Sequence, residues 1–366
     1  MWQYWNPVKI IFTETYIDEL IKLVDPKRKT ILICSQRFLK TDEFKLLNPI
    51  TKSVTVFTYI ENDPSFDSCD EAIRFAKSHL AEDIIAIGGG SVIDTAKAVR
   101  LALVTRSNNV TEMLKGELKH EFSIGLVAIP TTHGTASELT KWATIWNKKE
   151  KKKYSLSHDK NYPDYAIYDY HFVQSLPLNI SLITTLDALS HSFEALWNNN
   201  ANPISDAYAI KAIELIYENI NKLSESTSIE TRINLLKATM YSGLAFSNTK
   251  TAAAHSISYP LTSLYGIPHG IACSISLRSL FLLNATLIEA KIEKLLHELP
   301  IDTMNVFWGD VSKSINNKLK YSLSEYGIER KNLNDLIDLC FTKGRMDNNI
   351  KKITRNDVKQ ILEDVF

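Results

Sequence analysis

Four side chains in the second half of the chain have the types and the spacing to bind one metal ion: Asp187, His191, His255 and His269. Asp187 and His191 are four residues apart, so on a helix they share a face, and a carboxylate oxygen and an imidazole nitrogen can converge on one ion. One carboxylate with three neutral imidazoles suits a divalent metal such as Fe²⁺ or Zn²⁺ and leaves a coordination position open. Any one of these histidines alone is better explained as a hydrogen-bonded core residue. The four together predict a metal centre.

The last two candidate ligands need a turn between them. His255 and His269 are fourteen residues apart, which is about 21 Å along one straight helix. That distance is too long for a shared ion. Pro260, together with Gly266 and Pro268, predicts a break and a turn that bring the chain back.

These residues follow a half-chain in which short β-rich runs alternate with helical patterns. The expected strands are 30–34, 54–60, 84–87, 124–129 and 165–168, with helices over 69–80 and from 91 onward. Such alternation implies parallel strands with crossover helices. From residue 178 the strand signals stop and helical periodicity takes over, as in 203–223, 229–246 and 354–366. We expect an α/β domain over 1–177 and an all-helical domain over 178–366, with Asn202 and Pro203 at a helix start.

Composition excludes several classes of partner. Lys plus Arg and Asp plus Glu number 42 each in 366 residues, so the overall charge gives no reason to expect nucleic acid or an anionic membrane. Four scattered cysteines form no CxxC pair and predict ordinary reduced thiols: Cys34, Cys69, Cys273 and Cys340. We find no secretory signal and no stretch near the ~18 apolar residues of a membrane span, so we expect a soluble cytoplasmic protein.

A glycine-rich turn predicts a phosphate site. Gly88, Gly89 and Gly90 lie between an apolar strand and an amphipathic helix, where free amides and the positive end of the helix dipole attract a pyrophosphate. Ser91 and Asp94 extend this candidate cofactor site. The alternative is a tight turn in which Ser91 and Asp94 form only a capping box, because the spacing is not GxGxxG.

A second polar loop, 130–140, leaves another predicted strand at its carboxyl end, where open α/β sheets bind ligands. Two such loops favour a nucleotide crevice in a Rossmann-like dinucleotide-binding domain. The candidate cofactor-binding residues in this loop are Thr131, Thr132, Thr135 and Ser137.

The strings GGGSVIDTAK and PTTHGTASE resemble the iron-containing alcohol dehydrogenase family, which has a dehydroquinate synthase-like fold. The resemblance extends from 6–12 to 344–349, nearly the whole chain. In that family the metal ligands occur as D-x-x-x-H and as two histidines fourteen apart ending in PHG. Asp187, His191, His255 and His269 match this pattern residue by residue. The resemblance implies a metal that acts as a Lewis acid on a carbonyl or alcohol oxygen while NAD(P) carries the hydride.

The resemblance also bears on cofactor choice. NAD users of the family tend to have an acidic residue just after the first strand, because a carboxylate binds the ribose hydroxyls and repels a 2′-phosphate. Here that position reads Ser35, Gln36 and Arg37, which favours NADP(H) over NAD(H). Arg37 as a solvated surface residue is the alternative.

Two departures from the family pattern point to the substrate. Tyr259 stands where the family usually has a histidine that helps relay a proton, so Tyr259, a ribose hydroxyl or water could serve. Lys250 and Thr251 precede His255 where small or apolar residues are usual, and a cation beside a metal favours a substrate with an anionic tail. The alternatives are packing for Tyr259 and solvation for Lys250.

The strings KTAAAHSISYPLT and EALWNNNANPISD look most like the phosphonoacetaldehyde reductase branch of the family, which makes 2-hydroxyethylphosphonate in phosphonate biosynthesis. Lys153 and Arg278 are weaker candidates for the anion. Glu194 shares the helix face of the first two ligands and could orient a ligand imidazole, or form a structural salt bridge.

Four other functions are alternatives. A sugar-phosphate lyase similar to dehydroquinate synthase would retain NAD without net turnover. It would use a richer set of Lys, Arg and Asn groups for a polyhydroxylated phosphate, which the motifs of this chain fit poorly. A glycerol-type zinc dehydrogenase, or a reductase of another small aldehyde, leaves Lys250 unexplained. A silent binding protein would not need all four metal ligands. Family members are often dimers, so we expect a possible homodimer.

Overall fold

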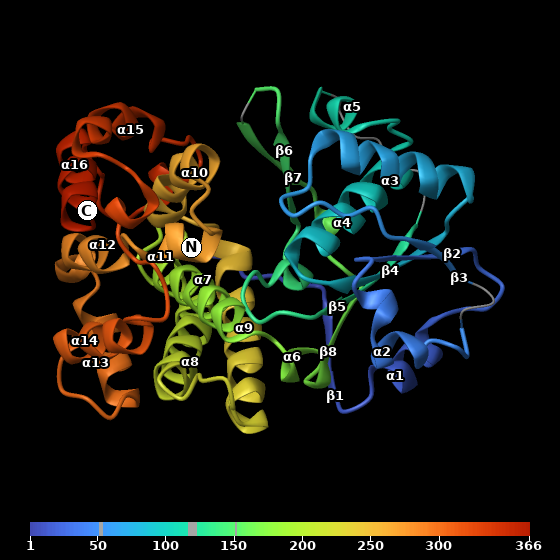
Figure 1. Ribbon diagram of the computed structural model, residues 1–366, viewed down its shortest axis with the longest axis horizontal. Helices are drawn as coiled ribbons and strands as arrows, with labels where there is room; N and C mark the ends of the chain where they lie inside the picture. Colours follow the sequence, from blue (N-terminus) through green and yellow to red (C-terminus); the bar gives the residue numbers. More distant parts are fainter. Residues whose placement is uncertain (51–53, 116–122, 151) are drawn as a thin grey trace. The chain divides into compact units, whose positions relative to one another are not determined.

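The computed structural model describes residues 1–50, 54–115, 123–150 and 152–366. The chain divides into two compact units, which Figure 1 shows. An α/β unit contains Pro7–Thr132 and Ala136–Ser175, and a helical unit contains Leu176–Phe366. The short segments Met1–Asn6 and His133–Thr135 belong to the helical unit, although both lie within the expected first domain.

A six-stranded sheet forms the centre of the α/β unit, with strand order β1-β8-β5-β4-β2-β3 and parallel pairing throughout the described ladders. The strands are β1 (Lys9–Thr13), β2 (Thr30–Cys34), β3 (Val54–Phe57), β4 (Asp83–Gly88), β5 (Gly125–Pro130) and β8 (Tyr165–Asp169). The predicted parallel sheet is confirmed. β1 is not among the predicted strands. β3 ends three residues before its predicted end, because the ends of elements carry the weakest sequence signal.

Alternating side chains of the strands supply two separate cores, one on each face of the sheet. Ile31 and Ile33 of β2 pack with α3 and α4, whereas Leu32 and Cys34 pack on the other face with α1 and α6. The helices of this unit are α1 (Tyr16–Leu23), α2 (Asp42–Lys45), α3 (Phe66–Ser78), α4 (Gly90–Thr105), α5 (Val110–Lys115) and α6 (His171–Gln174). Burial on both faces explains why the central strands read as continuous apolar runs.

The described residues from 178 onward form helices and short turns, with a single isolated bridge between Asn198 and Asn349. The helices are α7 (Leu178–Leu196), α8 (Pro203–Ile220), α9 (Ile229–Thr249), α10 (Ala253–Tyr265), α11 (His269–Ser274), α12 (Leu277–Asn284), α13 (Glu289–Glu298), α14 (Met304–Ile315), α15 (Leu333–Leu339) and α16 (Arg355–Asp364). The expected cap is present, since Asn202 accepts hydrogen bonds from Ile204 N and Ser205 N at the start of α8.

Helix α7 runs beside α8, α9 and α11 (Figure 1) and is buried along most of its length. The segment His269–Leu287, which includes α11 and α12, is long and apolar enough to cross a membrane, contrary to our expectation. It is 61% buried in its most apolar window, so its apolar side chains are accounted for by the core of the helical unit.

Candidate metal centre

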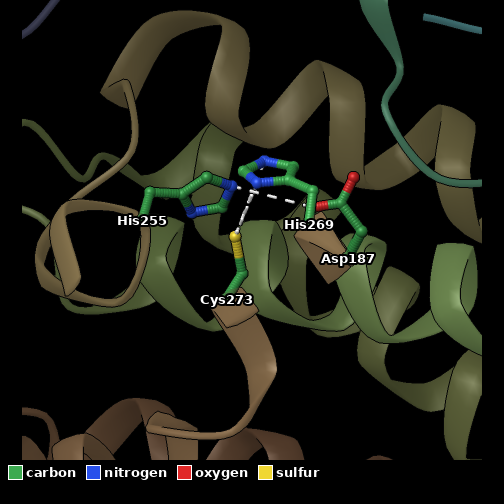
Figure 2. Close-up of side chains that lie close together, drawn as sticks. All are labelled: Asp187, His255, His269 and Cys273. Atoms are coloured by element: carbon green, nitrogen blue, oxygen red, sulfur yellow. Dashed lines mark hydrogen bonds and ion pairs between the residues drawn. The ribbon is translucent and has the colours of Figure 1, made fainter. Parts of the chain in front are cut away.

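Four side chains of the helical unit bring their ligand atoms within 4.8 Å of one another (Figure 2). They are Asp187 from α7, His255 from α10, and His269 and Cys273 from α11. All but His269 are buried. Three of them are predicted metal ligands, and the fourth, Cys273, is not.

Asp187 and His255 direct unsatisfied atoms at the same point. Asp187 Oδ1 lies 3.7 Å from His255 Nε2, and neither atom has a hydrogen-bond partner among the described residues. Burial alone would raise the pKa of Asp187, but the facing histidines hold it well below its usual range. A buried anionic oxygen without a hydrogen bond is costly. A divalent cation at this point would satisfy both atoms, so the residues present fit the metal that the sequence predicts.

His191, the fourth predicted ligand, lies beside this group but outside its tightest set. Its Nδ1 is 3.6 Å from Asp187 Oδ1, as expected for residues one helical turn apart. Its ring stacks on Phe246 with centroids 4.0 Å apart and lies 4.3 Å from the His255 ring. His191 therefore stays a predicted ligand, adjacent to the ion position.

Glu194 contacts the His255 imidazole, an arrangement that fits both sequence interpretations: orientation of the ring and a structural salt bridge. His255 Nδ1 is 2.6 Å from Glu194 Oε2, and the His255 amide donates to Glu194 Oε1 at 3.0 Å. The carboxylate thereby directs Nε2 toward the ion position. Burial would raise the pKa of Glu194, but the neighbouring His255 and hydrogen bonds lower it.

Replacing Glu194 by glutamine is expected to weaken Zn²⁺ binding by about 10- to 100-fold, because the imidazole loses its anionic outer partner. Competition with a chromophoric zinc indicator measures this affinity. Glu214→Gln, which changes a carboxylate paired with Lys211 on α8, is the control and should bind normally. Unchanged affinity in Glu194→Gln would show that the ion pair is only structural.

The chain turns only once between His255 and His269, whereas the sequence predicted a break at Pro260 and a turn at Gly266 and Pro268. Helix α10 continues through Pro260, so our prediction of a break there is wrong. The chain turns at Gly266, whose φ of +65° a side chain would strain, and α11 begins at His269. Gly270 then packs so tightly on α7 that a Cβ atom would lie 2.0 Å from the Ile183 carbonyl oxygen. The glycine after His269 sets how closely α11 approaches α7.

The prediction of reduced thiols is confirmed for the four cysteines, and Cys273 has a further feature. All four are free and buried, but Cys273 Sγ lies 3.6 Å from both ring nitrogens of His269. Burial raises the pKa of the Cys273 thiol in the absence of a metal. The signal in the sequence was the four-residue spacing from His269, the same spacing that identified Asp187 and His191.

The predicted substrate residues occupy the segments before and after His255. Lys250 follows the end of α9 and is exposed, so it is not on the same helix as His255 and the helical distance that we expected does not apply. Tyr259 is half-buried on α10, one turn after His255, and its hydroxyl accepts a hydrogen bond from Arg345 Nε at 3.2 Å. Arg345 is a cation outside the set of predicted substrate residues.

The two weaker cation candidates have other surroundings. Lys153 Nζ lies 5.8 Å from the Trp146 ring centre, in an antiparallel hairpin of β6 (Trp142–Asn147) and β7 (Lys152–Ser157) that our sequence analysis missed. Residue 151 of its charged run lies outside the described residues. Arg278 is exposed and lines a cavity of about 530 Å³ with Tyr321 and Asp364.

Several candidate cofactor residues share one edge of the sheet. Since β2, β4 and β5 are parallel neighbours, their carboxyl ends lie together. Gln36 and Arg37 follow β2 and are exposed. The following residues adjoin the ends of β4 and β5: Gly88, Gly89, Gly90, Ser91, Thr131 and Thr132. Thr131 N donates to Gly88 O at 3.1 Å, which joins the two loops.

Asp94 and Ser137 bind each other, and Thr135 belongs to the helical unit. Asp94 accepts from Ser137 Oγ at 2.5 Å and from Thr144 N at 2.9 Å. Helix α4 has no side-chain cap, so the alternative of a Ser91–Asp94 capping box is wrong. Buried Lys97, whose pKa burial lowers to about 8, donates to Ser137 Oγ at 2.9 Å. Asp94 and Lys97 therefore anchor the second loop.

Comparison with known proteins decides the family. A model described as iron-containing alcohol dehydrogenase matches residues 7–170, and one for the C-terminal part of the Fe-containing alcohol dehydrogenase family matches residues 181–366. The chain belongs to the iron-containing alcohol dehydrogenase family. The α/β unit followed by a helical unit is the fold of this family, and Asp187, His255 and His269 form the metal site typical of it.

The relatives of this alcohol dehydrogenase family member differ in substrate and in cofactor. An NADPH-dependent butanol dehydrogenase of Clostridium saccharobutylicum is 30% identical over 84% of this chain and 82% of its own length. Alcohol dehydrogenase 4 of Schizosaccharomyces pombe is 28% identical over 68% of this chain, and the match spans 60% of that enzyme. A sulfoacetaldehyde reductase of Bifidobacterium kashiwanohense, solved with NAD⁺, superposes with a TM-score of 0.92 at 25% identity, covering 100% of this chain and 98% of its own.

Proposed function

We propose that this protein is a cytoplasmic, metal-dependent reductase that uses NADPH to reduce a short aldehyde with an anionic tail. Phosphonoacetaldehyde, which yields 2-hydroxyethylphosphonate, is the first candidate substrate, and a role in phosphonate biosynthesis follows from it. The observation that carries the anionic tail is the backbone of Lys250. Exposed Arg37 after β2, with no carboxylate beside it, supports the preference for NADPH over NADH.

Lys250 adopts φ of +69° and ψ of 175°, a region that glycine alone occupies readily. Its carbonyl oxygen accepts a hydrogen bond from Asn198 Nδ2 at 3.1 Å, which holds this conformation. Strain of this kind costs about 1–3 kcal/mol and is typical of functional sites. A lysine kept where glycine would be more stable supports a functional demand for its ammonium group.

A second cation, Arg345, supports the same substrate class. Arg345 donates to the hydroxyl of Tyr259, one helical turn beyond His255. A guanidinium has further N–H groups, and these match the oxygens of a phosphonate or sulfonate. Among the relatives, the sulfoacetaldehyde reductase acts on another two-carbon aldehyde with an anionic tail.

Different side chains would bind the metal, bind the anionic tail and supply the proton. A metal held by Asp187, His255 and His269 would supply Lewis-acid polarisation of the aldehyde oxygen. Lys250 and Arg345 would bind the anionic tail and so orient the aldehyde. Tyr259 lies within a turn of His255 and would hold the proton that the product alcohol receives.

The test follows NADPH absorbance with the metal-loaded protein, comparing phosphonoacetaldehyde and sulfoacetaldehyde with propionaldehyde. Lys250→Gly is expected to lower kcat/KM for the anionic aldehydes by about 10- to 100-fold, the value of a charge-assisted hydrogen bond. The same variant should unfold at higher denaturant concentration, because the strain at residue 250 is relieved. Lys237→Gly, which removes an exposed lysine of α9, is the control. This variant should keep the preference of the wild type for the anionic aldehydes.

If both the wild type and Lys250→Gly use propionaldehyde as efficiently as the anionic aldehydes, the anionic-tail proposal is contradicted. A small-aldehyde or glycerol-type dehydrogenase then becomes the leading function. If no aldehyde consumes NADPH or NADH, the lyase function becomes the leading candidate. Repeating the assay with NADH tests the cofactor preference. A higher kcat/KM with NADH would contradict the role given to Arg37.

A further inference from the structure

We infer that Cys273 is a metal ligand in this protein, binding through its sulfur to the same ion as Asp187, His255 and His269. The inference rests on the metal dependence of the proposed function, but not on the substrate. It makes the centre one with mixed carboxylate, imidazole and thiolate ligands. The sequence pattern that identified the site did not include this residue.

The distances between the candidate ligand atoms are those found around a small ion. Metal–nitrogen bonds of about 2.0–2.1 Å and metal–sulfur bonds of about 2.3 Å place tetrahedral ligands roughly 3.3–3.8 Å apart. Cys273 Sγ lies 3.6 Å from each of the two ring nitrogens of His269, one of which would face the ion, and Asp187 Oδ1 lies 3.7 Å from His255 Nε2. Figure 2 shows the thiol directed at the same point as the two imidazoles and the carboxylate.

The surroundings of Cys273 support a ligand role over simple packing. Its side chain is fully buried, yet it faces Asp187 Oδ1 and His255 Nε2, two buried polar atoms without a hydrogen-bond partner among the described residues. A thiol is a weak donor and cannot satisfy these atoms well. An ion between the sulfur, the oxygen and the nitrogen satisfies all three.

The geometry and the donor chemistry of Cys273 support its role as a ligand, whereas charge does not decide it. Two buried carboxylates, Asp187 and Glu194 beside His255, already supply two negative charges near the ion position. When the sulfur–metal bond forms, the thiol proton passes to solvent and no oxidation state changes. A thiolate also shifts preference toward Zn²⁺ and Co²⁺ and away from Mg²⁺. His191, 3.6 Å from Asp187, can complete the set as a further ligand.

The absorption spectrum of bound Co²⁺ tests directly whether the sulfur of Cys273 is a metal ligand. The full-length apoprotein, prepared with a chelator, is titrated anaerobically with Co²⁺ while its absorption spectrum is recorded. We expect the wild type to bind one Co²⁺ with a near-ultraviolet thiolate-to-cobalt charge-transfer band. Cys273→Ser should lose the band. Its Zn²⁺ affinity should fall at least about 10- to 100-fold, because a loss of that size already follows mutation of residues that only hydrogen-bond to a metal ligand. Cys34→Ser, which changes a buried thiol of the other unit, should keep the band.

Cys273→Asp keeps an anionic ligand, so it should restore much of the Zn²⁺ affinity without the band. This rescue separates a ligand role from a packing role, and it keeps the test valid if Cys273→Ser folds poorly. Stoichiometric Co²⁺ binding by the wild type without the band would overturn the inference and leave the proposed reductase intact. The band without aldehyde-dependent NADPH consumption would support the inference and contradict the proposed function. A wild type that binds no Co²⁺ would overturn both.

Discussion

Asp187→Asn is expected to lose its metal and at least about 10³-fold in kcat/KM for every aldehyde, because several kcal/mol of charge stabilisation disappear with the ion. Asp187 is the carboxylate of the ligand group, and asparagine has nearly its shape. The change therefore removes charge with little effect on packing. Metal content by elemental analysis, together with steady-state kinetics on metal-supplemented protein, measures both effects.

The control for Asp187→Asn is Asp310→Asn on α14. It makes the same change at an aspartate that accepts a hydrogen bond from Tyr217 and forms an ion pair with Lys313. It should retain a full metal complement and normal kinetics. An Asp187→Asn protein that keeps its metal and more than a tenth of its activity would contradict the assigned centre. Loss of metal with full activity would contradict the chemical role of the ion.

Gly270→Ala is expected to destabilise the helical unit by about 1–3 kcal/mol or more and to weaken metal binding, because overpacking forces α11 away from α7. The new Cβ would meet the Ile183 carbonyl oxygen at 2.0 Å, and a backbone atom cannot move aside as a side-chain end can. His269 precedes this glycine, so its imidazole moves with the helix. Urea denaturation measures the stability, and zinc titration measures the effect on the site.

Gly309→Ala is the matched control, since a Cβ there meets no atom within 4 Å and the residue lies inside α14. Alanine should stabilise this helix by roughly 0.5–1 kcal/mol through its better helix propensity. Metal affinity should stay unchanged. If Gly270→Ala behaves like Gly309→Ala, the tight packing of α11 on α7 does not position His269.

The carboxylate behind His255 shows how one buried charge supports the site. Glu194 accepts hydrogen bonds from both the amide and the Nδ1 of His255, so the imidazole can direct only Nε2 at an ion. Asp187 and Glu194 are seven residues apart on α7, which is two helical turns. One helix thus carries a predicted ligand and the group that orients another.

The sequence by itself determined the class of fold and most of the metal site. Apolar runs such as 30–34 and 84–87 predicted buried parallel strands, and helical periodicity from 178 predicted the second unit. Short spacings are informative because a helix places residues three, four or seven apart on one face. Asp187 accordingly lies beside His191 and shares α7 with Glu194. Gly270 is the glycine of the PHG motif of the family, and the structure gives its physical reason: a side chain there would collide with the backbone of α7.

Only the tertiary structure decided the features that depend on contacts between distant segments. Cys273 enters the ligand group because α11 packs on α7, and Arg345 reaches Tyr259 across 86 residues of chain. Asp94 binds the second loop in place of capping its own helix, and Lys97 binds the same loop. Lys250 holds a glycine-like backbone because Asn198 binds its carbonyl. Such partners have no fixed spacing in a sequence, so periodicity and local propensity cannot identify them.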